Sequence, residues 1–254
     1  MHDFAKLTWP EAKELFAADP VALLPVGATE AHGPHLPLDT DVTIAVAQAR
    51  RAAGILDEAG VTTLVMPPIA YTLAQFAFGF PGTITIRPTT LWNLVEDVVE
   101  SLEQHGVRRV VLCNSHLERQ HVQLLRGVCK DHAEVTKDKA QLLFPDITRR
   151  RWAGTLGEEF KSGDCHAGRY ESSIVLAADG ESVREEERQK LAPKEVRLVE
   201  KMLDGAPDFL AIGADEAWCG DPASATADEG ERLLDQLGQI VATSALEEWP
   251  ELAR

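Results

Sequence analysis

Short runs of continuously apolar residues alternate with segments of helical periodicity along most of this 254-residue chain. Continuous apolar strands separated by helices are typical of a mostly parallel sheet that is covered on both faces. Strands are expected at residues 22–27, 61–69, 83–87, 107–113 and 140–144. Helices are expected at residues 41–59, 88–105, 119–131, 169–178, 194–203 and 227–247. The pattern therefore predicts an α/β fold.

The composition narrows the possible partners and the location of the protein. Acidic residues outnumber basic ones, 41 to 25, and the formal net charge of −16 argues against nucleic acid and anionic membrane partners. No apolar run approaches the roughly 20 residues of a membrane-spanning helix. The amino-terminal residues lack a signal pattern, and the 4 cysteines lack paired spacing. We expect a cytoplasmic protein with reduced thiols, forming one domain over residues 1–254 because no linker or repeat divides it.

The expected strand at residues 22–27 is followed by a dense polar loop. This loop contains Glu30, His32, His35, Asp39 and Asp41. Mutual repulsion and desolvation oppose such a density of carboxylates and imidazoles unless a cation offsets them. Imidazole and carboxylate together are ligands of zinc, manganese, iron and cobalt. The loop therefore predicts a hydrolytic metal site at the end of a strand.

A second polar cluster follows the expected strand at residues 107–113, and parallel strands bring both clusters to one edge of the sheet. Residues two apart in extended backbone point the same way, so each cluster can present a pair of ligands. The candidate ligands are Glu30, His32, Asp41, His116 and Glu118. One catalytic zinc ion uses about three protein ligands. Five ligands are better explained by two metals about 3.5 Å apart that share one carboxylate.

Each candidate ligand taken alone has an ordinary alternative. Glu30 can be a loop carboxylate, Asp41 can be a helix N-cap, and His116 can be a buried histidine with satisfied hydrogen bonds. Short motifs of this kind are individually promiscuous, so the metal hypothesis depends on the five residues occurring together.

Longer motifs identify the chain as a member of the creatininase (creatinine amidohydrolase) family by resemblance. The first and longest is Pro25-Val-Gly-Ala-Thr-Glu-Ala-His-Gly-Pro-His-Leu-Pro-Leu-Asp-Thr-Asp41. The others, in the order of the family, are Phe80-Pro-Gly-Thr83, Asn114-Ser-His-Leu-Glu118, Asp164-Cys-His-Ala-Gly-Arg-Tyr-Glu-Ser172 and Gly220-Asp-Pro222 followed by Ala225-Thr226.

The resemblance implies a three-layer α/β/α sandwich with a mostly parallel central sheet, usually assembled as a homohexamer. It implies a binuclear metal-dependent amidohydrolase that hydrolyses a C–N bond of a small-molecule amide or cyclic amide by a metal-bridging hydroxide. Two divalent ions per subunit, zinc and/or manganese, are expected. By position, Glu30, Asp41 and His116 would hold one ion. His32, Asp41 and Glu118 would hold the other, with Asp41 as the bridge.

The resemblance also assigns catalytic positions. His166 matches the family's catalytic histidine and is expected to protonate the departing nitrogen. Glu118 belongs to the expected catalytic set as well as to the ligands. Glu171 matches the carboxylate that accompanies the histidine, although an ordinary carboxylate at a helix N-terminus is an equal alternative. His35 and Asp39 match family positions and are expected to be structural.

The chain departs from the creatininases proper at pocket positions. Leu117 stands where they carry tyrosine, Ser162 where they carry tryptophan, and Ala77 where many relatives carry histidine. Lost aromatic walls remove stacking worth about 1 kcal/mol per pair. We therefore expect the metal chemistry to be kept and creatinine to be a doubtful substrate. The alternative is a peptide or formamide hydrolase in a cofactor or natural-product pathway.

Four further interpretations concern other residues or another class of protein. Cys165 precedes His166, but adjacent loop residues usually point apart, which disfavours a cysteine–histidine amidase. A non-catalytic metal-binding protein is disfavoured because it would not need His166. Cys113 is expected in the core. Core packing, a pocket wall and a subunit contact all remain open for four aromatic residues, Tyr71, Phe76, Phe78 and Phe80.

Overall fold

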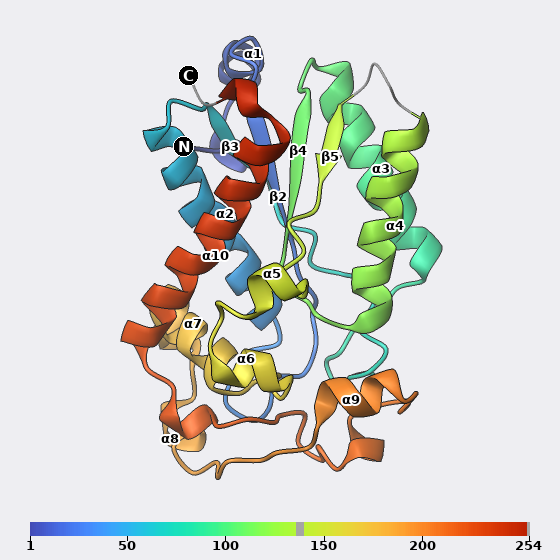
Figure 1. Ribbon diagram of the computed structural model, residues 1–254, viewed down its shortest axis with the longest axis vertical. Coiled ribbons are helices and arrows are strands. Elements are labelled where there is room, and N and C mark those ends of the chain that lie inside the picture. The colour runs from blue at the N-terminus through green and yellow to red at the C-terminus, as the bar shows by residue number, and fades with distance from the viewer. Residues whose placement is uncertain (136–139, 253–254) are drawn as a thin grey trace.

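The computed structural model describes residues 1–135 and 140–252 and is built around a five-stranded sheet (Figure 1). The strand order is β1-β3-β2-β4-β5, and every neighbouring pair is parallel. The strands are β1 (His2–Asp3), β2 (Val21–Val26), β3 (Thr63–Val65), β4 (Arg109–Asn114) and β5 (Gln141–Leu143). The longest register pairs Val21 with Arg109 and Val26 with Asn114, so β2 and β4 end together at the centre of the sheet. The predicted parallel sheet is confirmed.

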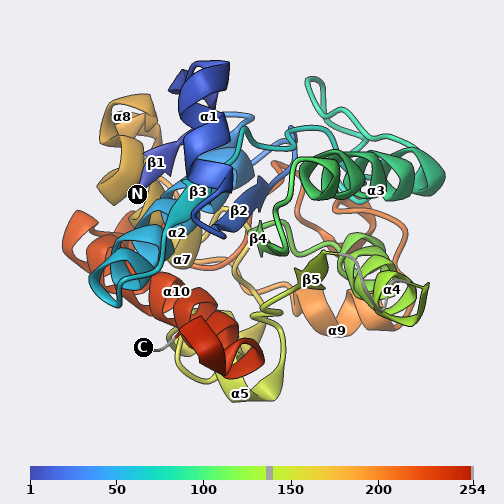
Figure 2. The same ribbon diagram turned by 90° about the horizontal axis from the view of Figure 1, so that it is seen from above.

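Long helices cover both faces of this sheet (Figure 2). The α-helices of eight or more residues are α1 (Trp9–Phe16), α2 (Thr40–Glu58), α3 (Pro88–Gln104), α4 (Arg119–Val135), α7 (Arg169–Asp179) and α10 (Ala227–Glu248). Helices α2 and α10 lie on one face, and α3 and α4 lie on the other. The expected α/β/α sandwich is thereby confirmed. Among the described residues, none of the helices combines the length and apolarity needed to cross a lipid bilayer.

The side chains of the central strands divide between the two faces, as the alternation along a strand requires. Leu24 and Leu112 pack with α3 and α4, whereas Leu23 and Cys113 pack with α2 and α10. Burial on both faces explains why the central strands are apolar at successive positions. Cys113 lies in the core as predicted.

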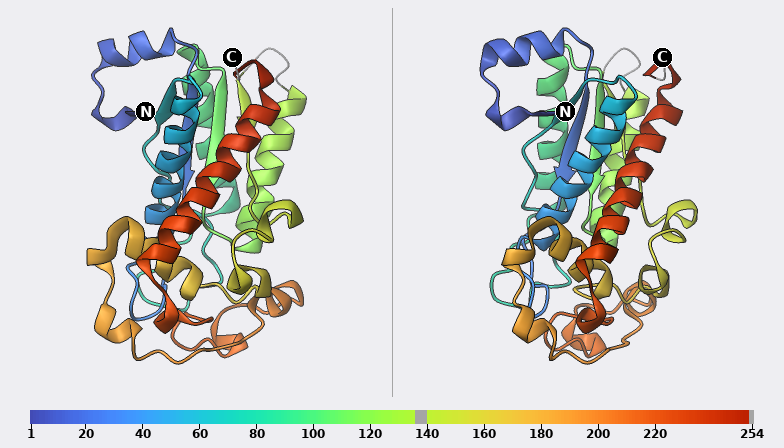
Figure 3. Two further views of the ribbon diagram at one scale, coloured as in Figure 1. Left: turned by 60° about the vertical axis from the view of Figure 1, so that its left-hand side comes forward. Right: turned by 90° about the vertical axis from the view of Figure 1, so that its left-hand side faces the viewer.

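Short helices and loops collect at the carboxyl ends of the strands, at the bottom of Figure 1 and in both views of Figure 3. The short α-helices are α5 (Arg150–Ala153), α6 (Glu158–Ser162), α8 (Glu185–Arg188) and α9 (Leu198–Leu203). Short 3-10 helices lie at Phe4–Lys6, Gly180–Ser182, Leu210–Ile212, Pro222–Ser224 and Pro250–Leu252. The carboxyl ends of the strands carry the candidate site.

Two predicted strands differ from the structure. The strand expected at residues 83–87 is wrong, because Ile84 and Thr85 form only isolated bridges with Thr29 and Thr72 in neighbouring loops. The strand expected at residues 61–69 is reduced to β3, because Pro67 and Pro68 follow it and have no backbone N–H for the ladder.

One predicted helix is shorter than expected, and the first elements of the chain were not predicted. The helix expected at residues 194–203 forms only from Leu198 onward, because Asp164 binds the backbone N–H groups of Val196, Arg197 and Leu198. The sequence does contain a signal for the start of helix α1, a threonine followed three residues later by a glutamate. The Glu11 carboxylate accepts a hydrogen bond of 2.7 Å from the backbone N–H of Thr8, the N-cap residue of the helix. The two-residue strand β1 has no comparable pattern.

Candidate metal centre

The candidate ligands come from four segments at the carboxyl edge of the sheet. Glu30 and His32 lie in the loop after β2, and Asp41 lies in the first turn of α2. His116 follows β4, and Glu171 lies in the first turn of α7. In open parallel sheets, ligands bind where the central strands end, and β2 and β4 are the central strands here.

Gly27 allows the start of α2 to reach this edge. A Cβ atom on Gly27 would lie 2.5 Å from the backbone nitrogen of Val42 and 2.7 Å from the carbonyl carbon of Asp41. No side chain fits in that space. The glycine therefore lets the end of β2 contact the first turn of α2, which brings Asp41 beside Glu30 and His32.

Asp41 faces two histidines through different oxygen atoms. Its Oδ2 atom lies 2.9 Å from His116 Nδ1, and its Oδ1 atom lies 3.4 Å from His32 Nε2. Glu30 Oε1 lies 3.3 Å from the same His116 nitrogen, and Glu171 Oε2 lies 3.6 Å from the same His32 nitrogen. Each oxygen of Asp41 thus lies close to a different group of nitrogen and oxygen atoms that could bind a metal ion.

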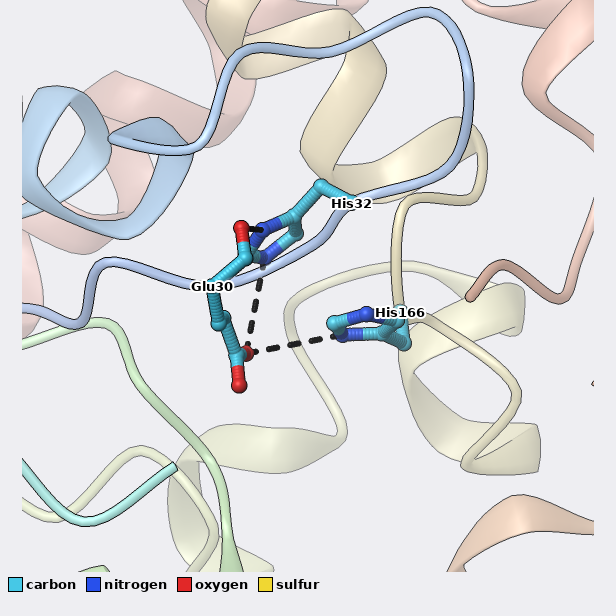
Figure 4. A group of neighbouring side chains, drawn as sticks. All are labelled: Glu30, His32 and His166. Atoms are coloured by element: carbon cyan, nitrogen blue, oxygen red, sulfur yellow. Dashed lines mark hydrogen bonds and ion pairs between the residues drawn. The ribbon is translucent and has the colours of Figure 1, made fainter. Parts of the chain in front are cut away.

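Three groups of buried residues have the arrangement of metal ligands. They are Glu30, Asp41 and His116; His32, Asp41 and Glu171; and Glu30, His32 and His166. Within each group the potential ligand atoms lie within 4.8 Å of one another. Figure 4 shows the third group, in which the carboxylate of Glu30 points toward the rings of both His32 and His166, and ion-pair contacts join it to each ring. The first group contains the three residues that were expected to hold one ion.

Hydrogen bonds to backbone carbonyls fix the three histidine rings. His32 Nδ1 lies 3.1 Å from Glu30 O, and His116 Nε2 lies 2.6 Å from Leu73 O. His166 Nε2 lies 3.0 Å from Ala31 O. A carbonyl oxygen only accepts, so these nitrogens carry the hydrogens, and the other nitrogen of each ring faces carboxylates. This arrangement holds imidazole ligands of metal ions in position.

The donor set fits divalent metal ions. Among the described residues, His32 Nε2 and Asp41 Oδ2 are buried side-chain atoms without a hydrogen-bond partner. Asp41 Oδ2 lies 2.9 Å from His116 Nδ1, but the two atoms do not have the geometry of a hydrogen bond. A buried polar atom left unpaired costs free energy, and a cation between these atoms removes that cost.

The charges of the cluster shift the pKa values of its members in the metal-free protein. Although burial opposes charge on the His32 ring, Asp41, Glu171 and Glu30 raise the pKa of His32 to about 10. Burial likewise opposes ionisation of Asp41, yet His32 and His116 hold the pKa of that carboxyl well below its usual range. Without metal, protons therefore bind to nitrogens that face carboxylates, and a metal ion would replace those protons.

Glu118 lies near the cluster, but it belongs to none of the three groups found among the described residues. Its Oε2 atom accepts a hydrogen bond of 2.9 Å from the backbone N–H of Phe76, and burial raises the pKa of its carboxyl group. Glu171 joins His32 and Asp41 at the place expected for Glu118. Glu171 also accepts a hydrogen bond of 2.6 Å from the backbone N–H of Ala167, and burial raises its pKa to about 8.

His166 lies at the wall of the cluster with one nitrogen toward Glu30, at 3.9 Å from Oε1. Its ring stacks on Phe209 with ring centroids 4.3 Å apart. Burial and the charge of His32 lower the pKa of His166 to about 4, so the ring is neutral near neutral pH. The next residue, Ala167, has a positive φ of 50°, which turns the chain sharply between His166 and α7.

His35 and Asp39 stay outside the ligand groups among the described residues. The buried ring of His35 is hydrogen bonded to the Ser172 hydroxyl at 2.9 Å, and Asp39 is an exposed residue that precedes α2. Sequence reasoning missed His121, whose ring packs on that of His116 with centroids 4.8 Å apart. His121 Nε2 is 2.7 Å from Asn114 Oδ1, and the Asn114 amide donates to the carbonyl of His116. The only available signal was its place five residues after His116.

A cavity of about 510 Å³ opens beside the cluster. Glu30, Asp41, His116, Glu118, His166 and Glu171 all line it. Two of the departures from the creatininase motifs, Leu117 and Ser162, line it as well. The third, Ala77, is buried in a small cluster with Phe76, which itself lines the cavity. The positions that differ are therefore largely those that a substrate would touch.

Cys165, Tyr71 and Phe78 are further residues that the sequence singled out. Burial raises the pKa of the Cys165 thiol well above its usual range, which makes a poor nucleophile. Tyr71 and Phe78 are 53% and 56% exposed, so neither packs in the core.

Comparisons with known proteins agree with this site. The model of the family described as Creatininase: Creatinine amidohydrolase matches residues 5–244. Creatinine amidohydrolase of Pseudomonas putida is 30% identical over 275 residues, covering 96% of each chain. The mycofactocin precursor peptide peptidase of Mycolicibacterium smegmatis is 31% identical over 232 residues, covering 89% of this chain and 84% of that protein.

The fold matches a solved structure described as "Creatininase Mn". The TM-score is 0.72 at 25% identity, and the match covers 97% of this chain and 98% of that chain. The structural match and the two relatives thus cover most of the chain, and the family model, over residues 5–244, includes each segment that supplies a candidate ligand. We conclude that this chain belongs to the creatininase family, a family of hydrolases.

Proposed function

We propose that this protein is a two-metal hydrolase that cleaves a C–N bond of an amide. The observation that carries the proposal is the position of Asp41, whose two oxygens face His116 and His32 separately. A carboxylate in that position can bridge two cations. A single ion would bind only one of the two histidines that face Asp41. The unprotonated ring nitrogen of the other histidine would then have no cation to bind.

The proposed ligand sets follow the distances. Glu30, Asp41 and His116 would hold one ion, the set that the resemblance to the family implied. His32, Asp41 and Glu171 would hold the second, so that Glu171 takes the place first expected for Glu118. Carboxylates and imidazoles suit zinc and manganese. Two such ions would supply a Lewis acid for the amide oxygen and would lower the pKa of a bound water.

His166 is proposed to move the proton that the reaction requires. Its Nε2–H is held by the carbonyl of Ala31, so Nδ1 is the free nitrogen at the cavity. Because its lowered pKa keeps the ring neutral, His166 can accept a proton from the attacking water and deliver it to the departing nitrogen. Glu118 lines the same cavity and is proposed to orient the water, with its carboxylate fixed by the N–H of Phe76.

The substrate is proposed to be an amide other than creatinine. Leu117 and Ser162 line the cavity where creatininases proper carry aromatic residues, so the stacking wall for a flat ring is missing. A peptide amide is the second candidate. It is favoured by the size of the cavity, about 510 Å³, and by the likeness to the mycofactocin precursor peptide peptidase. We further propose a cytoplasmic homo-oligomer, of which a hexamer is the form expected from the resemblance to the family.

Metal dependence tests the proposal. The protein would be stripped with a chelator, dialysed, and assayed against a panel of amides by release of amine, before and after manganese or zinc is added. We expect no turnover in the stripped protein and recovered turnover after addition. Turnover that persists in fully stripped protein would exclude the two-metal reaction.

A further inference from the structure

Three cationic side chains line the cavity, and one of them has no anionic partner. Arg126 binds Asp146 through its Nε atom at 2.7 Å, and Lys161 binds Glu158 at 2.5 Å. Arg119 is the exposed first residue of α4 and also lines the cavity. Within the part of the chain that the structure describes, its side chain forms neither an ion pair nor a hydrogen bond. Arg119 is thus a positive charge available to a ligand.

The charge balance of the cavity gives this arginine a role. Glu30, Asp41, Glu118 and Glu171 are the carboxylates that line the cavity, and the two divalent ions of the proposed function would neutralise them. Arg119 then leaves a local excess of positive charge in a chain whose net charge is −16. The field of the whole molecule repels anions, so an anionic ligand needs such a local cation to bind.

Helix α9 forms an apolar wall at the same cavity. Leu198, Val199, Met202 and Leu203 all line it. Val199 is 46% exposed and Leu203 is 58% exposed, although both belong to a short helix in which Leu198 is buried. Figures 1 and 2 show α9 beside the end of α4 at which Arg119 lies. Exposed aliphatic side chains at a cavity mark a surface that a ligand can cover.

We propose that the cavity binds amides that carry both a carboxylate and an aliphatic group. Arg119 receives the carboxylate, and the aliphatic side chains of α9 cover the apolar group. This inference rests on the proposed function and deepens it. The cavity volume of about 510 Å³ suits a ligand that carries an amide, a carboxylate and an aliphatic group, since small-molecule pockets measure about 300–1,000 Å³. N-acyl amino acids and short peptides share this chemistry.

Three probes separate the carboxylate from the aliphatic group. They are N-acetyl-leucine, its uncharged partner N-acetyl-leucinamide, and N-acetylglycine, which lacks the aliphatic side chain. Binding to the metal-loaded protein would be measured by calorimetry, and turnover would be measured separately. Arg119→Gln removes the proposed contact, and Arg150→Gln is its control because Arg150 is exposed and lies outside the cavity lining.

The apolar wall has a matched pair of variants of its own. Leu203→Ser shortens an exposed residue of the wall, and Leu94→Ser shortens an exposed residue of α3 that does not line the cavity. Both side chains are at the surface, so both variants should fold. We expect Leu203→Ser to weaken the binding of N-acetyl-leucine and to leave that of N-acetylglycine unchanged, because only the former covers the wall.

The expected result for Arg119→Gln is a loss of about tenfold in affinity for N-acetyl-leucine, typical of a charge-assisted hydrogen bond. Affinity for N-acetyl-leucinamide should not change, and Arg150→Gln should alter neither. Equal binding of the acid and the amide to the native protein, or equal losses for both in Arg119→Gln, would overturn the inference. Absence of binding by all three probes would overturn it as well.

Failure of this inference is distinguishable from failure of the proposed function. If metal-dependent hydrolysis of amides persists without preference for carboxylates, only the inference about Arg119 is wrong. If the protein needs no metal for turnover, the proposed function is wrong whatever the probes do. Comparing the binding of N-acetyl-leucine with that of the dipeptide Ala-Leu then shows whether the cavity prefers N-acyl amino acids or short peptides. Tight binding of either ligand supports the inference.

Discussion

Asp41 determines how the cluster can work, because its two oxygens face different histidines. The sequence predicted Asp41 as the shared ligand, and the structure places it between His116 and His32. From the sequence we expected Glu118 as a ligand of the second ion and Glu171 only as a carboxylate that accompanies His166. Spacing two residues from His116 favoured Glu118, but the side chain of Glu118 is held by the backbone N–H of Phe76, a contact between segments distant in sequence.

At the residue scale, replacing His166 with alanine should separate catalysis from metal binding. We expect turnover to fall by about 10²- to 10⁴-fold, the usual contribution of a general acid–base group. Metal content should stay at the native value, because the two proposed ligand sets do not include His166. His105→Ala serves as the control, since His105 is an exposed residue at the end of α3. An active His166→Ala enzyme would contradict the proposed proton transfer.

Helical periodicity and apolar runs predicted the long helices and the central strands well. Packing around the sheet determines where these patterns occur in the sequence. Helices α2, α3, α7 and α10 lie within one residue of their expected ends. The failures lie at the carboxyl edge, where contacts between loops replace repetitive packing. Asp164 binds three successive backbone N–H groups at the start of α9, and Ile84 pairs only with an isolated residue of a neighbouring loop. Such contacts leave no periodic pattern in the sequence.

At the scale of elements, the contact between β2 and α2 should tolerate no side chain at Gly27. Gly27→Ala places a Cβ 2.5 Å from the backbone nitrogen of Val42, so we expect a loss of about 1–3 kcal/mol in the free energy of unfolding. The displaced first turn of α2 should also weaken metal binding through Asp41. Denaturant titration and metal analysis measure the two effects.

Gly54→Ala in the same helix is the matched control for this prediction. A Cβ on Gly54 would meet no atom within 4 Å, so alanine should raise stability by about 1 kcal/mol through its better helix propensity. If Gly27→Ala were as stable as Gly54→Ala, the close approach of β2 and α2 would not be what positions Asp41.

On the scale of the whole molecule, one sheet edge collects the chemistry of distant parts of the chain. Loops after β2 and β4 supply Glu30, His32 and His116, and the starts of α2 and α7 add Asp41 and Glu171. The α/β pattern and the motifs predicted this convergence, because parallel strands end at one edge. The size and walls of the cavity could not be predicted, because α9 and the loops around it lack a repetitive pattern.

Metal content per chain tests the two-metal account most directly. It would be measured by inductively coupled plasma mass spectrometry on native protein, Glu171→Gln and Glu118→Gln, each loaded with manganese or zinc and freed of excess. We predict about two ions in the native protein and in Glu118→Gln, and about one in Glu171→Gln. One ion or none in the native protein, or loss of an ion in Glu118→Gln but not in Glu171→Gln, would contradict the account.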